Sequence, residues 1–218
     1  MAKPDSLFTL FQRSWRRKGK VDDHVTTDPG DAAFARAMDQ LQSALPPAVN
    51  VVGNAASLLD RPYGPIIDAV PTIRFNSAQI QDPAAQGSRW DFVATSNEDT
   101  LAHYAKTPPA FHTLLFTPYF DLHLDRPGHH PLPVPVLVYP IRLSLQLMAK
   151  LRARPTTGMQ ILWLLDALGR REVGIFGFDW KRTPTFYDPK RDRDPHNHFG
   201  EMMLARRLIR RNRWVLHR

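Results

Sequence analysis

The sequence predicts one α/β domain, in which helices flank a mostly parallel, Rossmann-like central sheet. Short runs of β-branched and other apolar residues alternate along the chain with longer runs of helical spacing. The 218 residues, 43% of them hydrophobic and 23% charged, suit a single globular domain with its own core. We expect residues 31–218 to form this domain and residues 1–30 to form a basic amphipathic segment before it.

The expected elements follow one another without an internal repeat. Strands are marked by compact runs of Val, Ile, Leu and Phe, and helices by apolar residues three and four positions apart. Strands are expected at residues 49–52, 72–76, 90–95, 112–117, 136–138 and 172–178. Helices are expected at residues 31–45, 55–59, 97–104 and 159–169, and in the arginine-rich tail through Leu204, Leu208 and Ile209. The proline-rich residues 118–140 otherwise predict a loop.

Two stretches stand out, and the first of them predicts a ligand site. In residues 49–76, the turn at Gly53 and Asn54 follows the first strand, and Asn76 follows the second. Gly53 would let the backbone approach a ligand, and the free N–H groups of residues 55–59 suit an anion. Open α/β sheets bind ligands at the carboxyl ends of their strands, so we interpret this stretch as the binding edge. The alternative is a plain strand-to-helix turn.

The second stretch is the start of a buried helix. Thr156, Thr157 and Gly158 give this helix a hydroxyl-rich N-terminus, and Gly169 ends it. Hydroxyl groups and unpaired N–H groups at a helix N-terminus can bind an anion without a charged side chain.

The basic charge indicates an anionic partner. The net charge is +8 and the isoelectric point is about 10.1, and the basic residues concentrate near both ends. Nucleic acid, a membrane surface and a nucleotide-bearing substrate are the candidates. Aromatic and aliphatic residues lie between the basic ones in residues 7–20, so this segment either binds an anionic bilayer or packs on the domain.

The absence of cysteine excludes a disulfide, a thiolate nucleophile and a thiolate zinc site. The first residues contain no apolar run long enough for a signal peptide or a spanning helix. We therefore expect a cytoplasmic protein, with a peripheral place on the inner face of the membrane as a further expectation.

Three segments, in this order, resemble the sialyltransferases of glycosyltransferase family 29. VVGNAASLLDRPYGPIIDAVPTIRFN is similar to the family's large motif, RPTTGMQILWLLDALGRREVGIFGFDW to its small motif, and HNHFGE to its very small motif. The resemblance covers about a third of the chain and implies a GT-A-type domain.

Two departures from the family pattern involve single residues. Thr185 occupies the place of a third-motif histidine that contacts phosphate in relatives, so Tyr187 is expected to help there. Val49 and Arg170 occupy the places of two cysteines that are joined in animal members, which agrees with the absence of cysteine here.

The resemblance implies an inverting glycosyltransferase that moves sialic acid or Kdo from a CMP donor to a glycan hydroxyl. The departing phosphate and the ribose need hydrogen-bond donors, and the acceptor hydroxyl needs a base. His196 is the expected base, and Glu201 would orient a nearby helix end or hold the imidazole. The expected nucleotide-binding residues are Gly53, Asn54, Asn76, Thr156, Thr157, Gly158 and Tyr187. We expect no cofactor and no metal ion, because CMP leaves as a single phosphate.

The sequence gives less information about the choice of substrates. Arg74 or Arg126 could meet the donor carboxylate, although Arg74 could equally be structural. A glycan or glycolipid such as lipopolysaccharide is the expected acceptor, selected by residues 118–140.

Two other functional classes stay open. His196, His198 and Glu201 could join His112, His123, His129 or His130 in a metal-dependent hydrolase site. The arginines between residues 206 and 218 could instead bind nucleic acid, although we expect a core helix with a basic outer face and no nucleic acid. Residues 192–194 imitate an Asp-x-Asp metal motif, but their mixed-charge surroundings indicate solvated surface.

Overall fold

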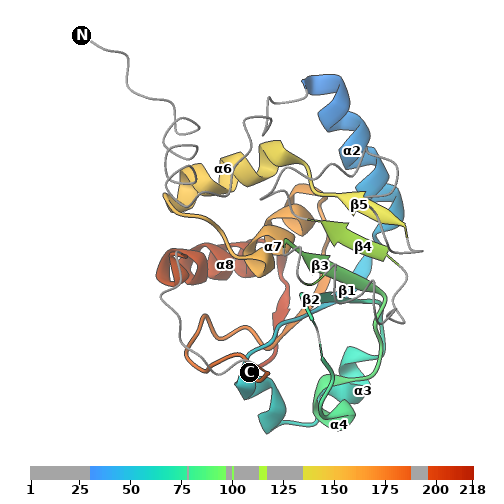
Figure 1. Ribbon diagram of the computed structural model, residues 1–218, viewed down its shortest axis with the longest axis vertical. Helices are drawn as coiled ribbons and strands as arrows, with labels where there is room; N and C mark the ends of the chain where they lie inside the picture. The colour runs from blue at the N-terminus through green and yellow to red at the C-terminus, as the bar shows by residue number, and fades with distance from the viewer. Residues whose placement is uncertain (1–29, 78, 97–99, 101–112, 117–134, 188–195) are drawn as a thin grey trace.

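The computed structural model describes residues 30–77, 79–96, 100, 113–116, 135–187 and 196–218 (Figure 1). Its strands are β1 (Ala48–Val52), β2 (Thr72–Phe75), β3 (Phe92–Thr95), β4 (Thr113–Phe116), β5 (Val136–Val138), β6 (Glu172–Phe176) and β7 (Val215–Leu216). Its helices are α2 (Asp31–Ala44), the 3-10 helix η1 (Ala56–Asp60), α3 (Gly64–Ile67), α4 (Pro83–Gln86), α6 (Ile141–Leu151), α7 (Thr157–Ala167) and α8 (His198–Asn212).

The seven strands form one parallel sheet in the order β5-β4-β3-β2-β1-β6-β7. From β1 the chain builds outward to β5, then returns and adds β6 and β7 on the other side of β1. The strand order therefore reverses between β1 and β6. In open α/β sheets, the crevice at such a reversal is the usual place for a ligand.

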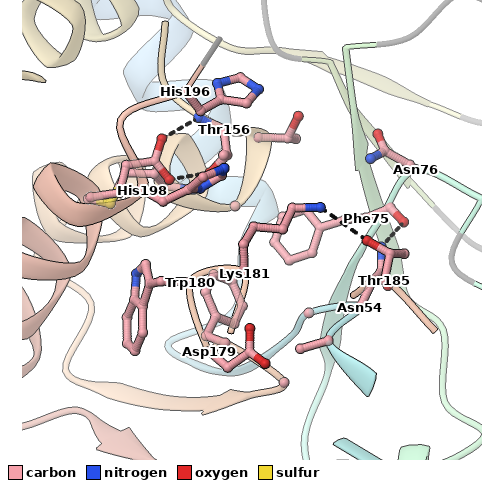
Figure 2. Close-up of a pocket in the computed structure, with 18 of the residues that line it drawn as sticks. Asn54, Phe75, Asn76, Thr156, Asp179, Trp180, Lys181, Thr185, His196 and His198 are labelled. Atoms are coloured by element: carbon pink, nitrogen blue, oxygen red, sulfur yellow. Dashed lines mark hydrogen bonds between the residues drawn. The ribbon is translucent and has the colours of Figure 1, made fainter. Parts of the chain in front are cut away.

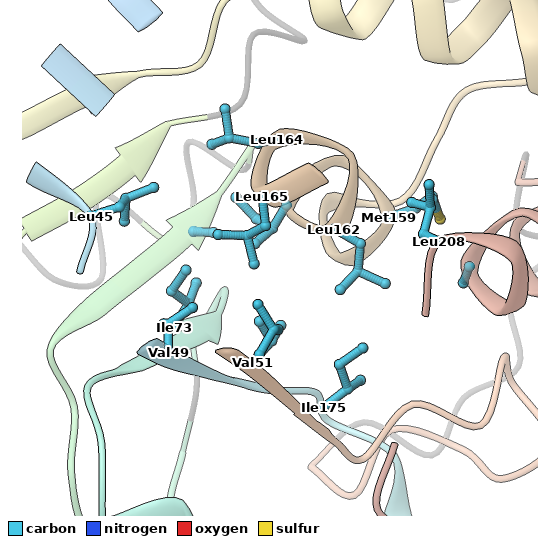
Figure 3. Close-up of a cluster of buried hydrophobic side chains, with 14 of the residues drawn as sticks. Leu45, Val49, Val51, Ile73, Met159, Leu162, Leu164, Leu165, Ile175 and Leu208 are labelled. Carbon is cyan, nitrogen blue, oxygen red and sulfur yellow. The ribbon is translucent and has the colours of Figure 1, made fainter. Parts of the chain in front are cut away.

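The β1 side chains alternate between two apolar layers. Val49 and Val51 belong to the larger core, where Figure 3 shows strand residues packed beneath leucines of α7. Val52 belongs to a smaller cluster with Leu58 and Ile67 on the other face. Figure 1 shows α6, α7 and α8 together on one side and α3 beside α4 at another corner. Because both faces are covered, the strands read as nearly continuous apolar runs.

Arg170 fastens α2 to the sheet. Its Nη2 donates hydrogen bonds to the carbonyls of Gln42 and Leu45, each at 2.7 Å. A cation at the C-terminal end of a helix satisfies carbonyls that have no partner within the helix. Arg170 is thus a structural link at a position where animal members of the resembled family carry a cysteine.

The predicted α/β class and the six expected strands are confirmed, as are the helices at residues 31–45, 159–169 and in the arginine-rich tail. The expected helix at residues 55–59 is a 3-10 helix, and the one at 97–104 lies outside the described residues apart from Thr100. Helix α6 was missed, although Leu143, Leu147 and Leu151 give it a buried stripe of period four. Its N-cap, Pro140, has no side chain that could signal a helix start. The missed helices α3 and α4 have four residues each, and β7 has two, so their periodicity is too short to read.

Segment 1–30 lies outside the described residues except for Gly30, and the first described helix begins at Asp31. None of the helices in the described part of the chain combines the length and apolar character that crossing a bilayer requires.

Candidate active site

A cavity of about 420 Å³ opens at the carboxyl ends of β1, β2 and β6, against the N-terminal ends of α7 and α8 (Figure 2). This is the place where the strand order reverses. All nine residues predicted for the site line it together: Gly53, Asn54, Asn76, Thr156, Thr157, Gly158, Tyr187, His196 and Glu201. Its volume suits a small-molecule ligand.

Gly53 and Gly158 make room for protein atoms. A Cβ on Gly53 would lie 2.3 Å from the carbonyl oxygen of Gly177. With a side chain there, the backbone after β1 could not lie this close to the backbone after β6. A Cβ on Gly158 would lie 2.9 Å from the ring of Phe178. Gly53 therefore lets the backbone meet that of Gly177, and the expected approach of a ligand to it stays a prediction.

The anion site expected at residues 55–59 is wrong. The Ala56 N–H donates to the carbonyl of Pro184 at 2.9 Å, and the Ser57 N–H donates to Thr183 Oγ1 at 3.3 Å. The segment that follows β6 therefore takes the donors of this helix start.

Asn54 is an acceptor in this cavity and not the expected donor. Its Nδ2 donates to the carbonyl of Phe75 at 3.2 Å and to the hydroxyl of Tyr187 at 3.0 Å, which uses both amide protons. Asn54 therefore offers a ligand its Oδ1, which can accept from a hydroxyl or amino group.

Asn76 lines the cavity at the end of β2, and its expected role as a donor stays a prediction. Its backbone is left-handed, with φ of 53°, and its Oδ1 accepts from Thr95 Oγ1 at 3.1 Å. Figure 2 shows its amide nitrogen on the cavity side. The hydrogen bond from Thr95 therefore holds the Asn76 side chain at the edge of the cavity.

The N-terminus of α7 is held by a buried carboxylate. Glu201 accepts from the N–H of Thr156 at 2.6 Å and from its hydroxyl at 2.8 Å, and that hydroxyl also accepts from Met159 N at 3.1 Å. The hydroxyl of Thr156, expected to be a donor to the ligand, is therefore engaged as a helix cap. Among the described residues, none accepts the backbone N–H of Thr157 or Gly158, so these are the donors that α7 offers.

Glu201 is therefore a positioning residue, bonded to the neighbouring helix start. The sequence left open whether it orients a helix end or holds the imidazole, and its hydrogen bonds support the first role. Only 3% of Glu201 is exposed. A buried carboxylate costs stability unless hydrogen bonds satisfy it, and both of its oxygens have one.

His196 has a defined tautomer. Its Nδ1 lies 2.7 Å from the carbonyl oxygen of Arg154. A carbonyl can only accept, so Nδ1 carries the proton and Nε2 of the neutral ring carries the lone pair. Figure 2 shows the ring beside Thr156, on the wall opposite Asn54 and Asn76. His196 can therefore accept a proton through Nε2.

Sequence reasoning missed a loop that follows β6 and includes Lys181. Trp180 and Lys181 have φ of 54° and 65°, a left-handed conformation that non-glycine residues rarely adopt. The Asp179 carboxylate holds this loop, accepting from Thr183 N at 2.9 Å and Ser57 Oγ at 3.2 Å. The loop aims a cation into the cavity.

Figure 2 shows Lys181 reaching across the cavity to Thr185, whose Oγ1 accepts from its Nζ at 3.2 Å. The lysine contacts the residue that stands where the resembled family has a histidine. A second missed residue, Ser96, pairs its hydroxyl with that of Thr157 at 3.2 Å. The position of Ser96 directly after a strand was the one signal available from the sequence.

Arg74 is structural and does not line the cavity. Its Nε donates to the carbonyl of Arg89 at 2.9 Å and its Nη2 to that of Gln86 at 2.7 Å. Burial lowers the pKa of Arg74 to about 10, although the nearby charges of Asp68 and Asp91 act to raise it. The idea that Arg74 meets a donor carboxylate is therefore wrong, and Arg126 lies outside the described residues.

No cluster of three or more His, Asp and Glu side chains suited to a metal ion occurs within the described ranges. The rings of His196 and His198 are 5.9 Å apart, and the carboxylate of Glu201 is bonded to Thr156. The other histidines of the hydrolase hypothesis and residues 192–194 lie outside the described part, as does most of 118–140.

No protein-family model and no curated protein matches the chain. Solved structures do match. A mammalian sialyltransferase in complex with Gal-beta-1-3GalNAc-ortho-nitrophenol has a TM-score of 0.60 and 16% identity, over 99% of this chain and 86% of that one. The sialyltransferase CstII from Campylobacter jejuni, in complex with the substrate analogue CMP-3FNeuAc, has a TM-score of 0.54 and 17% identity, over 78% and 79%. The likeness first seen in three motifs therefore extends to the fold.

Proposed function

We propose that this chain, which has the fold of sialyltransferases, is an inverting glycosyltransferase that transfers an acidic sugar from its CMP donor to a glycan hydroxyl. The single observation that carries the proposal is the meeting of three distant motifs in one cavity, at the reversal point of this fold. CstII, of the same fold, was solved with CMP and with CMP-3FNeuAc. A CMP-activated sugar is accordingly the donor we propose here.

His196 acts as the general base in this proposal. Its Nε2 lone pair takes the proton of the acceptor hydroxyl while the acceptor oxygen forms a bond to the anomeric carbon. The bond from that carbon to the phosphate oxygen breaks at the same time, and its electron pair leaves with CMP. Since Nδ1 is held by the Arg154 carbonyl, the ring is oriented for this transfer.

The departing phosphate needs positive groups that do not move during the reaction. We assign this role to the Thr157 and Gly158 N–H groups and to the ammonium of Lys181. Tyr187, which accepts a hydrogen bond from Asn54, adds a hydroxyl on the Asn54 side of the cavity. Lys181 supplies the charge that Thr185 cannot supply.

Neutralisation by Lys181 and a helix N-terminus is the reason to propose a reaction without a metal ion. The donor sugar is sialic acid or Kdo, since both carry a carboxylate beside the anomeric carbon. A surface glycan or glycolipid is the acceptor, and the enzyme works in the cytoplasm at the inner face of the membrane. The GT-A-type assignment stays a prediction within this proposal.

The test is calorimetric titration of the full chain with CMP, with UDP and GDP as controls, repeated in EDTA. We expect selective CMP binding that the chelator leaves unchanged. In Lys181→Met, the loss of one partly solvated charged contact should weaken CMP binding about tenfold. Arg36→Met, which removes an exposed charge from α2, should bind as the wild type does.

A product assay then separates the two donors. CMP-sialic acid and CMP-Kdo are offered with a lactose-terminated and a lipid A acceptor, and products are identified by mass. Failure to bind CMP, or binding that requires a metal ion, would overturn the proposal and favour the hydrolase hypothesis.

A further inference from the structure

The outer face of α8 combines exposed apolar and basic side chains. Phe199 is 71% exposed and Met203 is 50% exposed, one helical turn apart near the cavity. Arg206, Arg207 and Arg210 continue the same face and are also exposed. The opposite face of the helix packs into the core through Ala205 and Leu208. We call the five exposed residues the α8 outer face.

The arginines of this face have no acidic partner among the residues that the structure describes. No carboxylate within the described ranges forms an ion pair with Arg206, Arg207 or Arg210. Arg211, which lies to one side, pairs with Asp166 of α7. Glu201, the acidic residue in the first turn of α8, is buried against Thr156. The face is therefore a cationic surface with an apolar end.

We infer that the α8 outer face docks the protein on an anionic phospholipid bilayer. The arginines complement lipid phosphates and anionic headgroups, and each adds attraction within the screening distance of the surface. Phe199 and Met203 bury apolar area in the interface, as the apolar side chains of peripheral helices do. Nucleic acid would engage the arginines but would leave the exposed apolar pair unused.

Docking through this face also fixes the orientation of the cavity. His196 and His198 line the cavity, and Phe199 is the next residue along the chain. Figure 1 shows α8 at the edge of the described part of the molecule. A docked molecule therefore holds the cavity close to the bilayer. If the proposed function holds, this placement brings the cavity to a glycolipid acceptor in the bilayer. Docking itself does not depend on catalysis.

The experiment is co-sedimentation of the full chain with vesicles of phosphatidylcholine containing 30% phosphatidylglycerol, and with pure phosphatidylcholine vesicles. We expect binding to the anionic vesicles that weakens with added salt. Arg206→Glu with Arg210→Glu should weaken it at least about twentyfold, since each lost arginine accounts for about fivefold. Phe199→Ser with Met203→Ser should weaken it about tenfold by removing apolar burial.

Matched variants remove the same groups elsewhere. Arg36→Glu with Arg61→Glu makes the same charge change on other exposed sites, and Ile66→Ser removes a residue that is 50% exposed, as Met203 is. Both should bind vesicles as the wild type does. Unchanged thermal unfolding in every variant shows that a loss of binding is not a loss of folding.

Two outcomes overturn the inference. If Arg16→Glu with Arg17→Glu abolishes binding while the α8 variants keep it, the membrane contact belongs to residues 7–20. If duplex DNA binds in an Arg210-dependent and Phe199-independent way while vesicles do not bind, the face is a nucleic-acid surface.

The absence of cysteine permits a direct test of contact. A bimane label on Met203→Cys should be quenched by nitroxide lipids when vesicles are added. The same label on Ile66→Cys should be unaffected. Equal quenching of both, or of neither, would contradict docking through α8.

Discussion

Two polar clusters lie near the end of β2 and differ in whether their groups are bonded within the protein. The first, which we call the Arg74 cluster, joins Arg74, Asp68, Asp91, Arg89 and Gln86. The second lines the cavity. Arg74 and Asn76 are two residues apart, yet one belongs to the closed cluster and the other to the cavity.

The Arg74 cluster is satisfied by its own members and by nearby backbone. Asp68 accepts from the N–H groups of Ser88 and Arg89 at 2.8 Å each, and Asp91 accepts from Thr72 N at 2.9 Å. Burial acts to raise the pKa of Asp68, but these hydrogen bonds and the Arg74 charge outweigh it and lower the pKa. Such a cluster stabilises the fold and offers a ligand nothing.

The cavity keeps donors and acceptors that face a space instead of a protein partner. The N–H groups of Thr157 and Gly158 are examples within the described residues, as is Oδ1 of Asn54. The comparison teaches that residue type does not reveal function, because both clusters are rich in charged and amide groups. Function follows from the groups that the fold leaves to be satisfied by a ligand.

The largest expected effect is on catalysis, in His196→Ala. Removing a general base costs about a thousandfold in kcat. We expect this loss with CMP affinity within about twofold of wild type, measured by initial rates and calorimetry. His198→Ala, which also changes a cavity-lining histidine, is the matched control and should retain most of the rate. If CMP affinity falls together with kcat, His196 is a binding residue.

Arg74→Met should have the next largest effect, and on stability alone. It leaves the carbonyls of Gln86 and Arg89 without their donor, which costs about 2–4 kcal/mol of unfolding free energy. Urea unfolding measures this loss. At a temperature where the variant is folded, CMP affinity should match wild type. A variant of full stability with weakened CMP binding would assign Arg74 to the cavity after all.

Glu201→Gln should lower both stability and CMP affinity, because Glu201 is buried and also supports the cavity. The amide keeps one acceptor for the Thr156 N–H but loses the charge-assisted bond from its hydroxyl, worth about 1–2 kcal/mol. The free energy of unfolding should therefore fall by this amount. CMP affinity should fall about tenfold, since the N-terminus of α7 loses its support. A fall in kcat with unchanged affinity and stability would make Glu201 catalytic instead.

The sequence was informative where local chemistry decides the structure. The glycine turn after β1, the hydroxyl-rich start of α7 and the strand residues each depend on neighbours in the sequence. The convergence of nine residues on one cavity followed because parallel strands end at one edge.

What was missed depends on contacts between distant segments. Segment 183–184 caps the start of η1, and Phe178 fills the space left by Gly158. The left-handed backbone at Trp180 and Lys181 has no sequence signal, because neither residue favours it. Lys181 could therefore be assigned to the cavity only from the structure.

The smallest expected effect again contrasts two histidines. His217 stacks on Phe176 with ring centroids 4.1 Å apart, outside the cavity lining, and burial lowers its pKa. As pH falls below about 6.5, His217 takes up a proton in the unfolded chain before it does so in the folded protein. Proton binding therefore favours the unfolded state, and stability falls until the pH reaches the lower pKa of the folded protein. His217→Phe keeps the stacking and removes the titration. Wild type should therefore lose more stability than the variant between pH 7.5 and 5.5, measured by thermal unfolding. If stability depends on pH in the same way in both proteins, His217 does not change its protonation on unfolding. The pH dependence of kcat should be the same in both proteins, because His196 is unaltered.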